Sequence, residues 1–186
     1  MANGTLKVSN IETSSGSGTI TLGQSGETIA LGSGVTSKMN QPAFEAYSTA
    51  DQTISDDVYT KVQFDTERFD TDGCYDNATN YRFTPTVAGK YFIYAFARLA
   101  STSSTGVEQA DIGIYKNGSQ VLNSGNNFDA NDIKQHTAVI NGIITFNGSS
   151  DYIEVFARIN VISGTPTILD FNEKNVVFGA YRIGVE

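Results

Sequence analysis

The residues that most often build catalytic and metal centres are scarce in this sequence. Its 186 residues include one cysteine, one histidine and no tryptophan. The single cysteine, Cys74, excludes an internal disulfide, so folding does not require an oxidising compartment. It lies in an acidic stretch that disfavours a thiolate, and we interpret it as a small buried or half-buried residue. The single histidine, His136, has no acid–base partner beside it in the sequence, and we interpret it as a surface or interface residue.

Charged residues are also few, and positive charge is the scarcer sign. Lysine and arginine number 12 against 20 aspartates and glutamates, which gives a net charge of −8. Nucleic-acid binding requires a basic stripe, so the composition excludes that function. Nine acids against two bases lie between Glu45 and Asp76, so this window alone carries −7. We expect the window to form a solvated acidic rim.

Long apolar runs are missing, which argues against insertion into a membrane. The first residues lack the basic-then-apolar pattern of a secretory signal. The sequence has no phosphate-binding glycine loop, dinucleotide fingerprint, Cys/His metal cluster or Gly-x-Ser-x-Gly elbow. We therefore expect a soluble protein that is made in a cytosol and is not an enzyme.

What the sequence does contain divides near residue 40. Between residues 13 and 37, 17 of 25 residues are Gly, Ser or Thr. Within this stretch the unit 19–23 recurs as 28–32, with an alternation typical of short strands. We predict an arm over residues 1–40 and a β domain over residues 41–186. The arm is either a flexible linker or an attachment arm that orders on contact with other chains through its apolar residues Ile20, Leu22, Ile29 and Leu31.

From Pro42 onward, aromatic and β-branched residues occur in short runs that turn residues separate, and no run of ten keeps a helical period. This pattern predicts an all-β sandwich or jelly roll. Asn117-Gly118 is the strongest hairpin signal, because both turn positions favour positive φ. Asn141-Gly142 indicates either another turn or a bulge inside a long strand. The predicted strands are 43–47, 58–64, 90–99, 110–116, 119–122, 136–146, 151–161, 167–171 and 175–185.

The predicted strand from Tyr91 to Leu99 is apolar on both faces. In a sandwich one face would enter the core and the other would need a cover, for which a partner subunit is the simplest candidate. Two matching triplets, Phe96-Ala97-Arg98 and Phe156-Ala157-Arg158, each place Phe and Arg on one face of a strand. They either line an inter-subunit surface, with the arginines paired to acids of the next chain, or match by coincidence.

A series of landmarks begins at Phe64 and continues with Tyr75-Asp76, Phe83-Thr84 and a Gly89-x-Tyr91 turn. The segments 114–118 (Ile-Tyr-Lys-Asn-Gly) and 178–181 (Phe-Gly-Ala-Tyr) follow in order. Together these motifs resemble the signature of the C1q/TNF-like jelly-roll family, over about residues 43–186. The resemblance implies a C1q/TNF-like jelly-roll sandwich that assembles as a homotrimer. It also implies a set of core and signature positions: Phe64, Tyr75, Phe83, Gly89, Tyr91, Phe178 and Gly179.

Three acids near one turn, Asp70, Asp72 and Asp76, offer the hard oxygen ligands that calcium prefers. Their spacing fits no EF-hand, and the terminal glutamate of such a loop is missing. Calcium binding by some C1q-like relatives nevertheless keeps this metal as an alternative. We interpret the three acids as a solvated turn and predict no other cofactor.

The opening segment, residues 4–23, resembles fibre-like structural proteins of marine tailed bacteriophages. With the head, it predicts a virion structural protein that is made in the host cytoplasm: a trimeric tail-fibre tip, or a capsid decoration such as a head fibre. The arm would bind other virion proteins, and the head would contact a host-surface glycan or protein with multivalent avidity. The alternative is a soluble C1q-like or lectin-like binding module unrelated to a virion. A third hypothesis, a carbohydrate-cleaving enzyme, would need two carboxylates beside a cleft, which the acids of 45–76 would have to supply.

Overall fold

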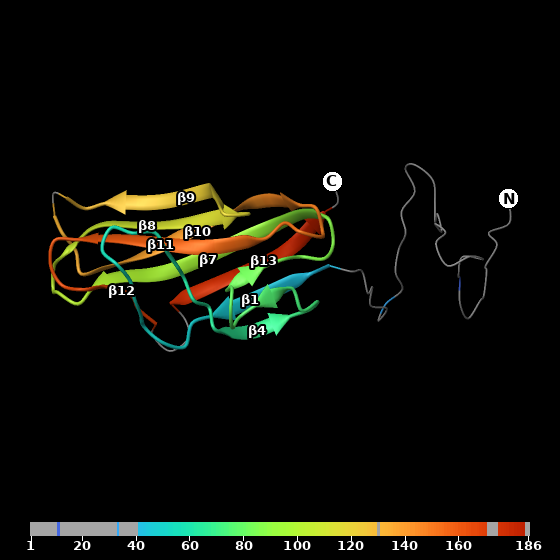
Figure 1. Cartoon of the computed structure of the whole chain (residues 1–186), viewed down its shortest axis with the longest axis horizontal. Helices are drawn as coiled ribbons and strands as arrows, with labels where there is room; N and C mark the ends of the chain where they lie inside the picture. The colour runs from blue at the N-terminus through green and yellow to red at the C-terminus, as the bar shows by residue number, and fades with distance from the viewer. Residues whose placement is uncertain (1–10, 12–32, 34–40, 130, 171–174, 185–186) are drawn as a thin grey trace. The chain divides into compact units, whose positions relative to one another are not determined.

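Residues 11, 33, 41–129, 131–170 and 175–184 are described by the structure, which is a computed structural model of the chain. The chain divides into two units, Met1–Met39 and Asn40–Glu186. The arm residues Ile20, Leu22, Ile29 and Leu31 lie outside the described residues. The second unit, which we call the head, is all-β in its described residues (Figure 1). None of the described residues forms a helix that is long and apolar enough to cross a bilayer.

Two antiparallel sheets enclose one core in the head. The strands of sheet A are β1 (Ala43–Tyr47), β2 (Gln52–Thr53), β4 (Thr66–Asp70), β7 (Gly89–Ser101), β10 (Gln135–Phe146), β12 (Pro166–Ile168) and β13 (Val176–Gly184). The strands of sheet B are β3 (Thr60–Lys61), β5 (Tyr75–Asp76), β6 (Arg82–Phe83), β8 (Val107–Lys116), β9 (Ser119–Asn127) and β11 (Ile153–Val161).

Strand β7 is the centre of sheet A. One of its edges pairs with β10 along nearly its whole length. Its other edge pairs first with β13 and then, beyond Ala97, with β12. Strand β1 lies outside β13, and β4 lies outside β1. The first and last strands of the head are therefore neighbours in the middle of one sheet.

Aromatic residues from both sheets fill the core. Phe44 stacks against Tyr75 and Phe83 at ring-centroid distances of 4.7 and 4.5 Å, and it meets Phe178 edge-on at 4.9 Å. Such aromatic pairs contribute about 0.5–1.5 kcal/mol each beyond their buried area. The structure buries all five aromatic signature positions, which are Phe64, Tyr75, Phe83, Tyr91 and Phe178.

Two turns depend on positive backbone dihedrals that the sequence indicates. Asn117 and Gly118 have φ values of 51° and 79° and join β8 to β9, so the predicted hairpin is confirmed. Gly89 has a φ of 146°, and a side chain there would clash with the Gly184 carbonyl oxygen and with Arg182. Glycine is therefore required where the chain enters β7.

Several strand boundaries differ from the prediction. The predicted strand 58–64 pairs only over β3, after which the chain crosses from sheet B to β4 of sheet A. The predicted strand 119–122 extends to Asn127, and the short strands β2, β4, β5 and β6 were missed because they carry too few apolar positions to alternate. Asn141-Gly142 is neither turn nor bulge, since β10 pairs with β7 there without a register shift. Gly142 instead leaves room for the Leu122 side chain.

Candidate binding and assembly surfaces

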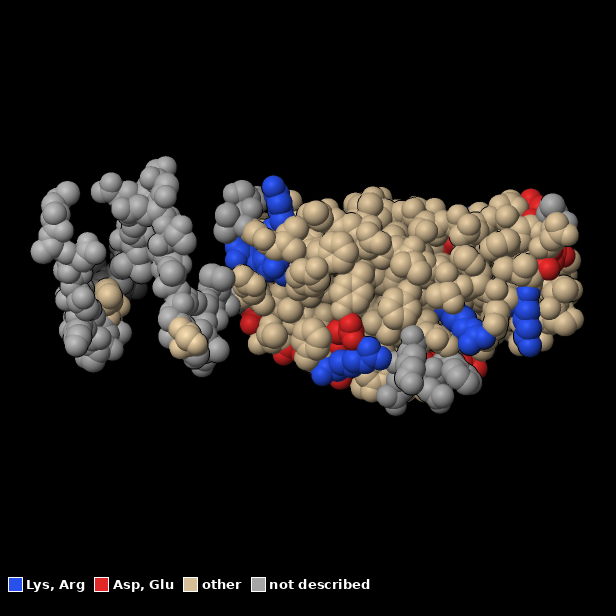
Figure 2. All heavy atoms as spheres, turned by 180° about the vertical axis from the view of Figure 1, so that it is seen from behind, with Lys and Arg blue, Asp and Glu red and all other residues tan. Residues whose placement is uncertain are grey.

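The outer face of sheet A is apolar. Along β7, residues 91, 93, 95 and 97 point into the core, so the alternate residues point outward. On β10, Val139 and Ile143 lie opposite two of these residues and are 54% and 61% exposed. We define the sheet A face as the large apolar side chains of this surface, which are Phe92, Tyr94, Phe96, Val139, Ile143 and Tyr181. Figure 2 shows the broad uncharged surface of the head, with Lys, Arg, Asp and Glu gathered near its margins.

A polar chain crosses one side of the sheet A face. Glu45 accepts hydrogen bonds from the Tyr94 hydroxyl and from Arg68 Nη1, the latter at 2.6 Å. The guanidinium of Arg68 lies 5.1 Å from the centre of the Tyr47 ring. Burial, followed by the bond to Glu45, raises the pKa of Tyr94, so its hydroxyl stays a donor. The Tyr94 ring covers Gly179, where any side chain would clash with it.

The outer face of sheet B carries a paired charge network. Arg158 on β11 lies opposite Asp111 on β8 and donates to it from Nε and Nη2 at 2.8 and 2.5 Å. It also donates to Asp57 at 3.1 Å, and its guanidinium lies 5.2 Å from the centre of the Tyr59 ring. Asp111 is nearly fully buried, and an unpaired carboxylate there would be strongly destabilising. The guanidinium of Arg158 compensates this buried charge.

The two Phe-Ala-Arg triplets are not brought together. Phe96 and Arg98 lie on the outer face of sheet A, whereas Phe156 and Arg158 lie on the outer face of sheet B. They therefore do not share one surface of a single chain. Within the chain, Arg158 pairs with Asp57 and Asp111. Participation of either triplet in a subunit contact stays a prediction.

The acids of the 45–76 window hold turns together. Asp70 accepts the backbone N–H groups of Asp72 and Tyr75 at 3.1 and 2.8 Å. Asp65 binds the backbone N–H and hydroxyl of Thr49. Asp70 thus caps its own turn, and Asp65 joins two segments that are 16 residues apart.

Asp76 is the most heavily engaged of these acids. It accepts the backbone N–H groups of Ala78, Thr79 and Asn80 and the Asn80 side-chain amide. These bonds, led by that of Thr79, lower the pKa of Asp76 to about 2. No group of three or more His, Cys, Asp or Glu side chains is arranged to hold a metal ion in the described part of the chain. The oxygens of Asp70 and Asp76 that calcium would need are directed at backbone amides.

Neither the histidine nor the cysteine is placed for catalysis. His136 Nε2 lies 3.0 Å from the Asn126 side-chain amide, and its ring lies 5.3 Å from that of Phe128. Cys74 is buried, and burial, with smaller contributions from Asp70 and Asp72, raises the pKa of its thiol. A raised pKa leaves the thiol protonated, which makes it a poor nucleophile.

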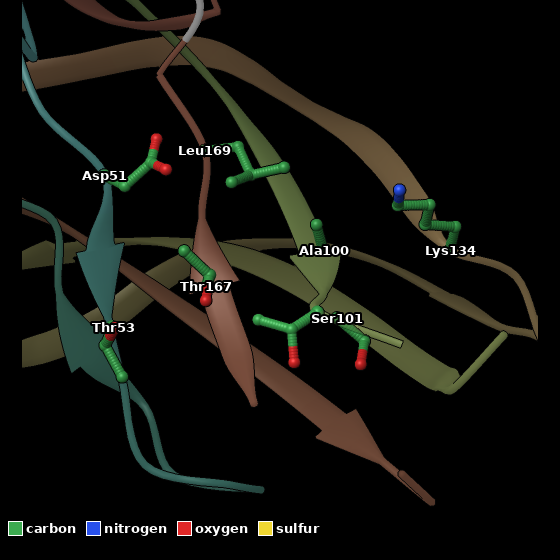
Figure 3. Close-up of a pocket in the computed structure, with 8 residues that line it drawn as sticks. Asp51, Thr53, Ala100, Ser101, Lys134, Thr167 and Leu169 are labelled. Carbon is green, nitrogen blue, oxygen red and sulfur yellow. The ribbon is translucent and has the colours of Figure 1, made fainter. Parts of the chain in front are cut away.

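A pocket of about 430 Å³ opens at one end of sheet A (Figure 3). Thr53, Thr167 and Ala100 form a row across β2, β12 and β7. Asp51 lies near the Thr53 end of this row, and Lys134 lies beyond its Ala100 end. Sequence reasoning missed the pocket, because its lining comes from four separate segments that show no common motif. The lining consists of Asp51, Thr53, Ala100, Ser101, Thr102, Lys134, Thr167 and Leu169.

Comparison with known proteins identifies the fold. No protein-family model matches the sequence, and no curated protein matches it. Eiger TNF from S. frugiperda is similar in structure, with a TM-score of 0.53, 8% identity and coverage of 78% of this chain and 93% of that one. Murine APRIL has a TM-score of 0.53 and 11% identity, with coverage of 77% of this chain and 100% of that one. The globular domain of zebrafish complement 1qA has a TM-score of 0.53 and 13% identity, with coverage of 78% of this chain and 99% of that one. The fold of the head is therefore a C1q/TNF-like jelly roll.

Proposed function

We propose that this chain is a non-enzymatic structural and binding protein whose head assembles as a homotrimer through the sheet A face. The observation that carries the proposal is the continuous apolar surface on one sheet, with Val139, Ile143 and Tyr181 each about half exposed or more. Soluble monomers rarely leave such a patch uncovered. Burying a half-exposed side chain of this size contributes about 1 kcal/mol, so several of them support a stable contact.

The polar groups of the sheet A face favour burial against a partner. Glu45, Tyr94 and Arg68 bind one another within the chain. Covering them would therefore leave no unpaired charge, which is the main penalty when a charged group enters an interface. The resemblance to C1q/TNF-like proteins supports three subunits as the closed assembly.

On a particle, this head would be a knob held by the arm of residues 1–40. The arm's resemblance to fibre-like proteins of marine tailed phages supports a virion structural protein, at a tail-fibre tip or on the capsid, made in the host cytoplasm. The arm would bind other virion proteins, and three heads would contact a host-surface glycan or protein with avidity. A soluble C1q-like or lectin-like module is the second candidate, supported by the same fold.

The solution mass of the full chain tests the assembly. A trimer of 20.0 kDa chains has a mass of about 60 kDa by light scattering. We expect Ile143→Lys to reduce the mass to that of a monomer, because it places a charge in the sheet A face. Val121→Lys, which likewise replaces an exposed aliphatic residue by lysine but on β9, is the matched control and should stay trimeric. A monomeric wild type would refute the proposal.

Fractionation of infected cells tests the particle. Co-sedimentation with virions that is lost when residues 1–40 are deleted would support the virion assignment. Recovery of the wild type only as a free trimer would favour the soluble module.

A further inference from the structure

The pocket of Figure 3 lies at the end of the head that is remote from residue 43. Ala43 pairs with Tyr181, which pairs with Phe92. The pocket floor is at Ala100, eight residues further along β7. At about 3.3 Å per residue, this separates the two levels by roughly 26 Å. Figure 1 likewise shows the start of β1 and strand β12 at opposite ends of the head.

Four of the eight lining residues carry a hydroxyl group, and hydrogen bonds within the chain decide whether three of these hydroxyls can still donate or accept. Ser101 and Thr167 donate to the backbone carbonyls of Ser163 and Thr165, so their remaining capacity is to accept, and the Ser103 N–H already uses one acceptor site of Ser101. Thr102 accepts the Thr165 N–H at 2.9 Å, so its proton is available to a ligand. The lining thus presents both acceptors and a donor, the combination that a polyhydroxylated ligand can satisfy.

Two opposite charges complete the lining. Asp51 accepts the Asp170 N–H at 2.9 Å, which holds its carboxylate at the pocket rim. Lys134 lies at the other end of the lining and takes part in none of the ion pairs of the described residues. Its ammonium group is exposed and can pair with an anionic ligand at short range, whereas the net charge of −8 repels anions at longer range.

We infer that this pocket binds a sugar that carries a carboxylate, such as a uronic acid unit. The carboxylate binds Lys134, and the ring hydroxyls bind Asp51 and the Ser and Thr hydroxyls. A volume of about 430 Å³ lies within the range of small-ligand pockets and accommodates one sugar unit with water. Ala100, Leu169 and the threonine methyl groups give the lining an apolar surface as well, against which the C–H face of a sugar ring can pack.

The biological role of this site rests on the proposed function, in which three distal pockets would act together at an acidic surface glycan. The binding of a single sugar does not depend on the proposed function, because residues of one chain form the whole lining. The two proposals therefore fail separately. Ile143→Lys, if monomeric, should still bind the single sugar.

Titration calorimetry or ligand-observed NMR on the full chain tests the inference, with D-glucuronic acid as the probe and D-glucose as its neutral control. We expect saturable binding of glucuronic acid and binding of glucose that is at least about tenfold weaker, the value of one charge-assisted hydrogen bond. Lys134→Met should weaken glucuronic acid about tenfold and leave glucose unchanged. Thr53→Val removes a protein hydroxyl group that would bind either sugar, so it should weaken the binding of both sugars.

Lys90→Met is the matched control, since Lys90 is exposed at the opposite end of β7. It should bind as the wild type does. Equal affinity for the two sugars, no binding of either one, or an unchanged affinity in Lys134→Met would overturn the inference. The solution mass and circular dichroism of each variant show whether it is folded, so loss of binding by misfolding is recognised.

Discussion

Replacing Asp76 shows whether its carboxylate stabilises the head by capping a turn or by binding a metal ion. Its carboxylate accepts four hydrogen bonds, three of them from the consecutive backbone N–H groups of residues 78–80. These bonds lower its pKa from 3.8 to about 2. The full difference corresponds to at most about 2.5 kcal/mol. Because the side chain is partly exposed, solvent screening reduces this contribution, and we expect about 1 kcal/mol.

The pH dependence follows from the direction of this pKa shift. A depressed pKa in the folded state means that the stabilisation is complete above 3.8, the value expected for the unfolded chain. It is lost as the pH falls from 3.8 towards 2, because the folded carboxylate is then protonated as well. The free-energy difference between wild type and Asp76→Asn should therefore shrink over this interval.

Urea denaturation of wild type, Asp76→Asn and Asp76→Ala at pH 7 and near pH 2.5 measures both effects. We expect Asp76→Ala to lose about 1 kcal/mol at pH 7, and added calcium to leave the wild-type midpoint unchanged. A difference that stays constant with pH, or a calcium-dependent midpoint that Asp76→Asn abolishes, would refute the turn-cap explanation.

Three further substitutions test other contacts by urea denaturation. Asp111→Ala should lower the free energy of unfolding by about 2 kcal/mol, because it leaves the three-quarters-buried side chain of Arg158 without its main partner. Replacing both residues should cost less than the sum of the two single changes. Gly142→Ala should destabilise the head by about 1–3 kcal/mol, since the added Cβ would lie 2.5 Å from Leu122 Cδ1. Adding Leu122→Ala should relieve part of this cost. If the effects of the two changes are additive, the proposed clash is contradicted. Asn117→Val should cost about 1 kcal/mol or more because a β-branched residue disfavours the φ of 51°, and an unchanged midpoint would show that the hairpin tolerates another turn.

The long strands could be predicted from sequence because each carries enough residues to show alternation. β7 and β10 match the predicted runs within two residues at each end, and Asn117-Gly118 fixes the hairpin from local backbone preference alone. Three of the two-residue strands, β2, β5 and β6, could not be predicted, because a strand of that length is defined by its partner and not by its own pattern. Strand β5, for example, consists of Tyr75 and Asp76 alone.

The candidate surfaces show the same division. An apolar outer face was predictable from the residues of β7 itself, since both sides of that strand are apolar. The separation of the two Phe-Ala-Arg triplets was not, because sheet membership depends on the connections between strands. The pocket depends on how loops around Asp51, Lys134 and Leu169 approach the end of β7, and no spacing in the sequence records that approach.

The position of β13 also constrains how the head is made. This strand is the last of the head, yet it lies between β1 and β7, which precede it by many residues. During synthesis, sheet A cannot close until residues 176–184 have left the ribosome. Until then, the edge of β1 that pairs with β13 in the folded head remains unpaired. Native contacts between such distant segments slow folding, towards the millisecond-to-second range typical of β sandwiches. The exposed edges of incomplete chains are also the state most open to mispairing with one another, so a cell producing many copies would benefit from rapid completion of the final strand.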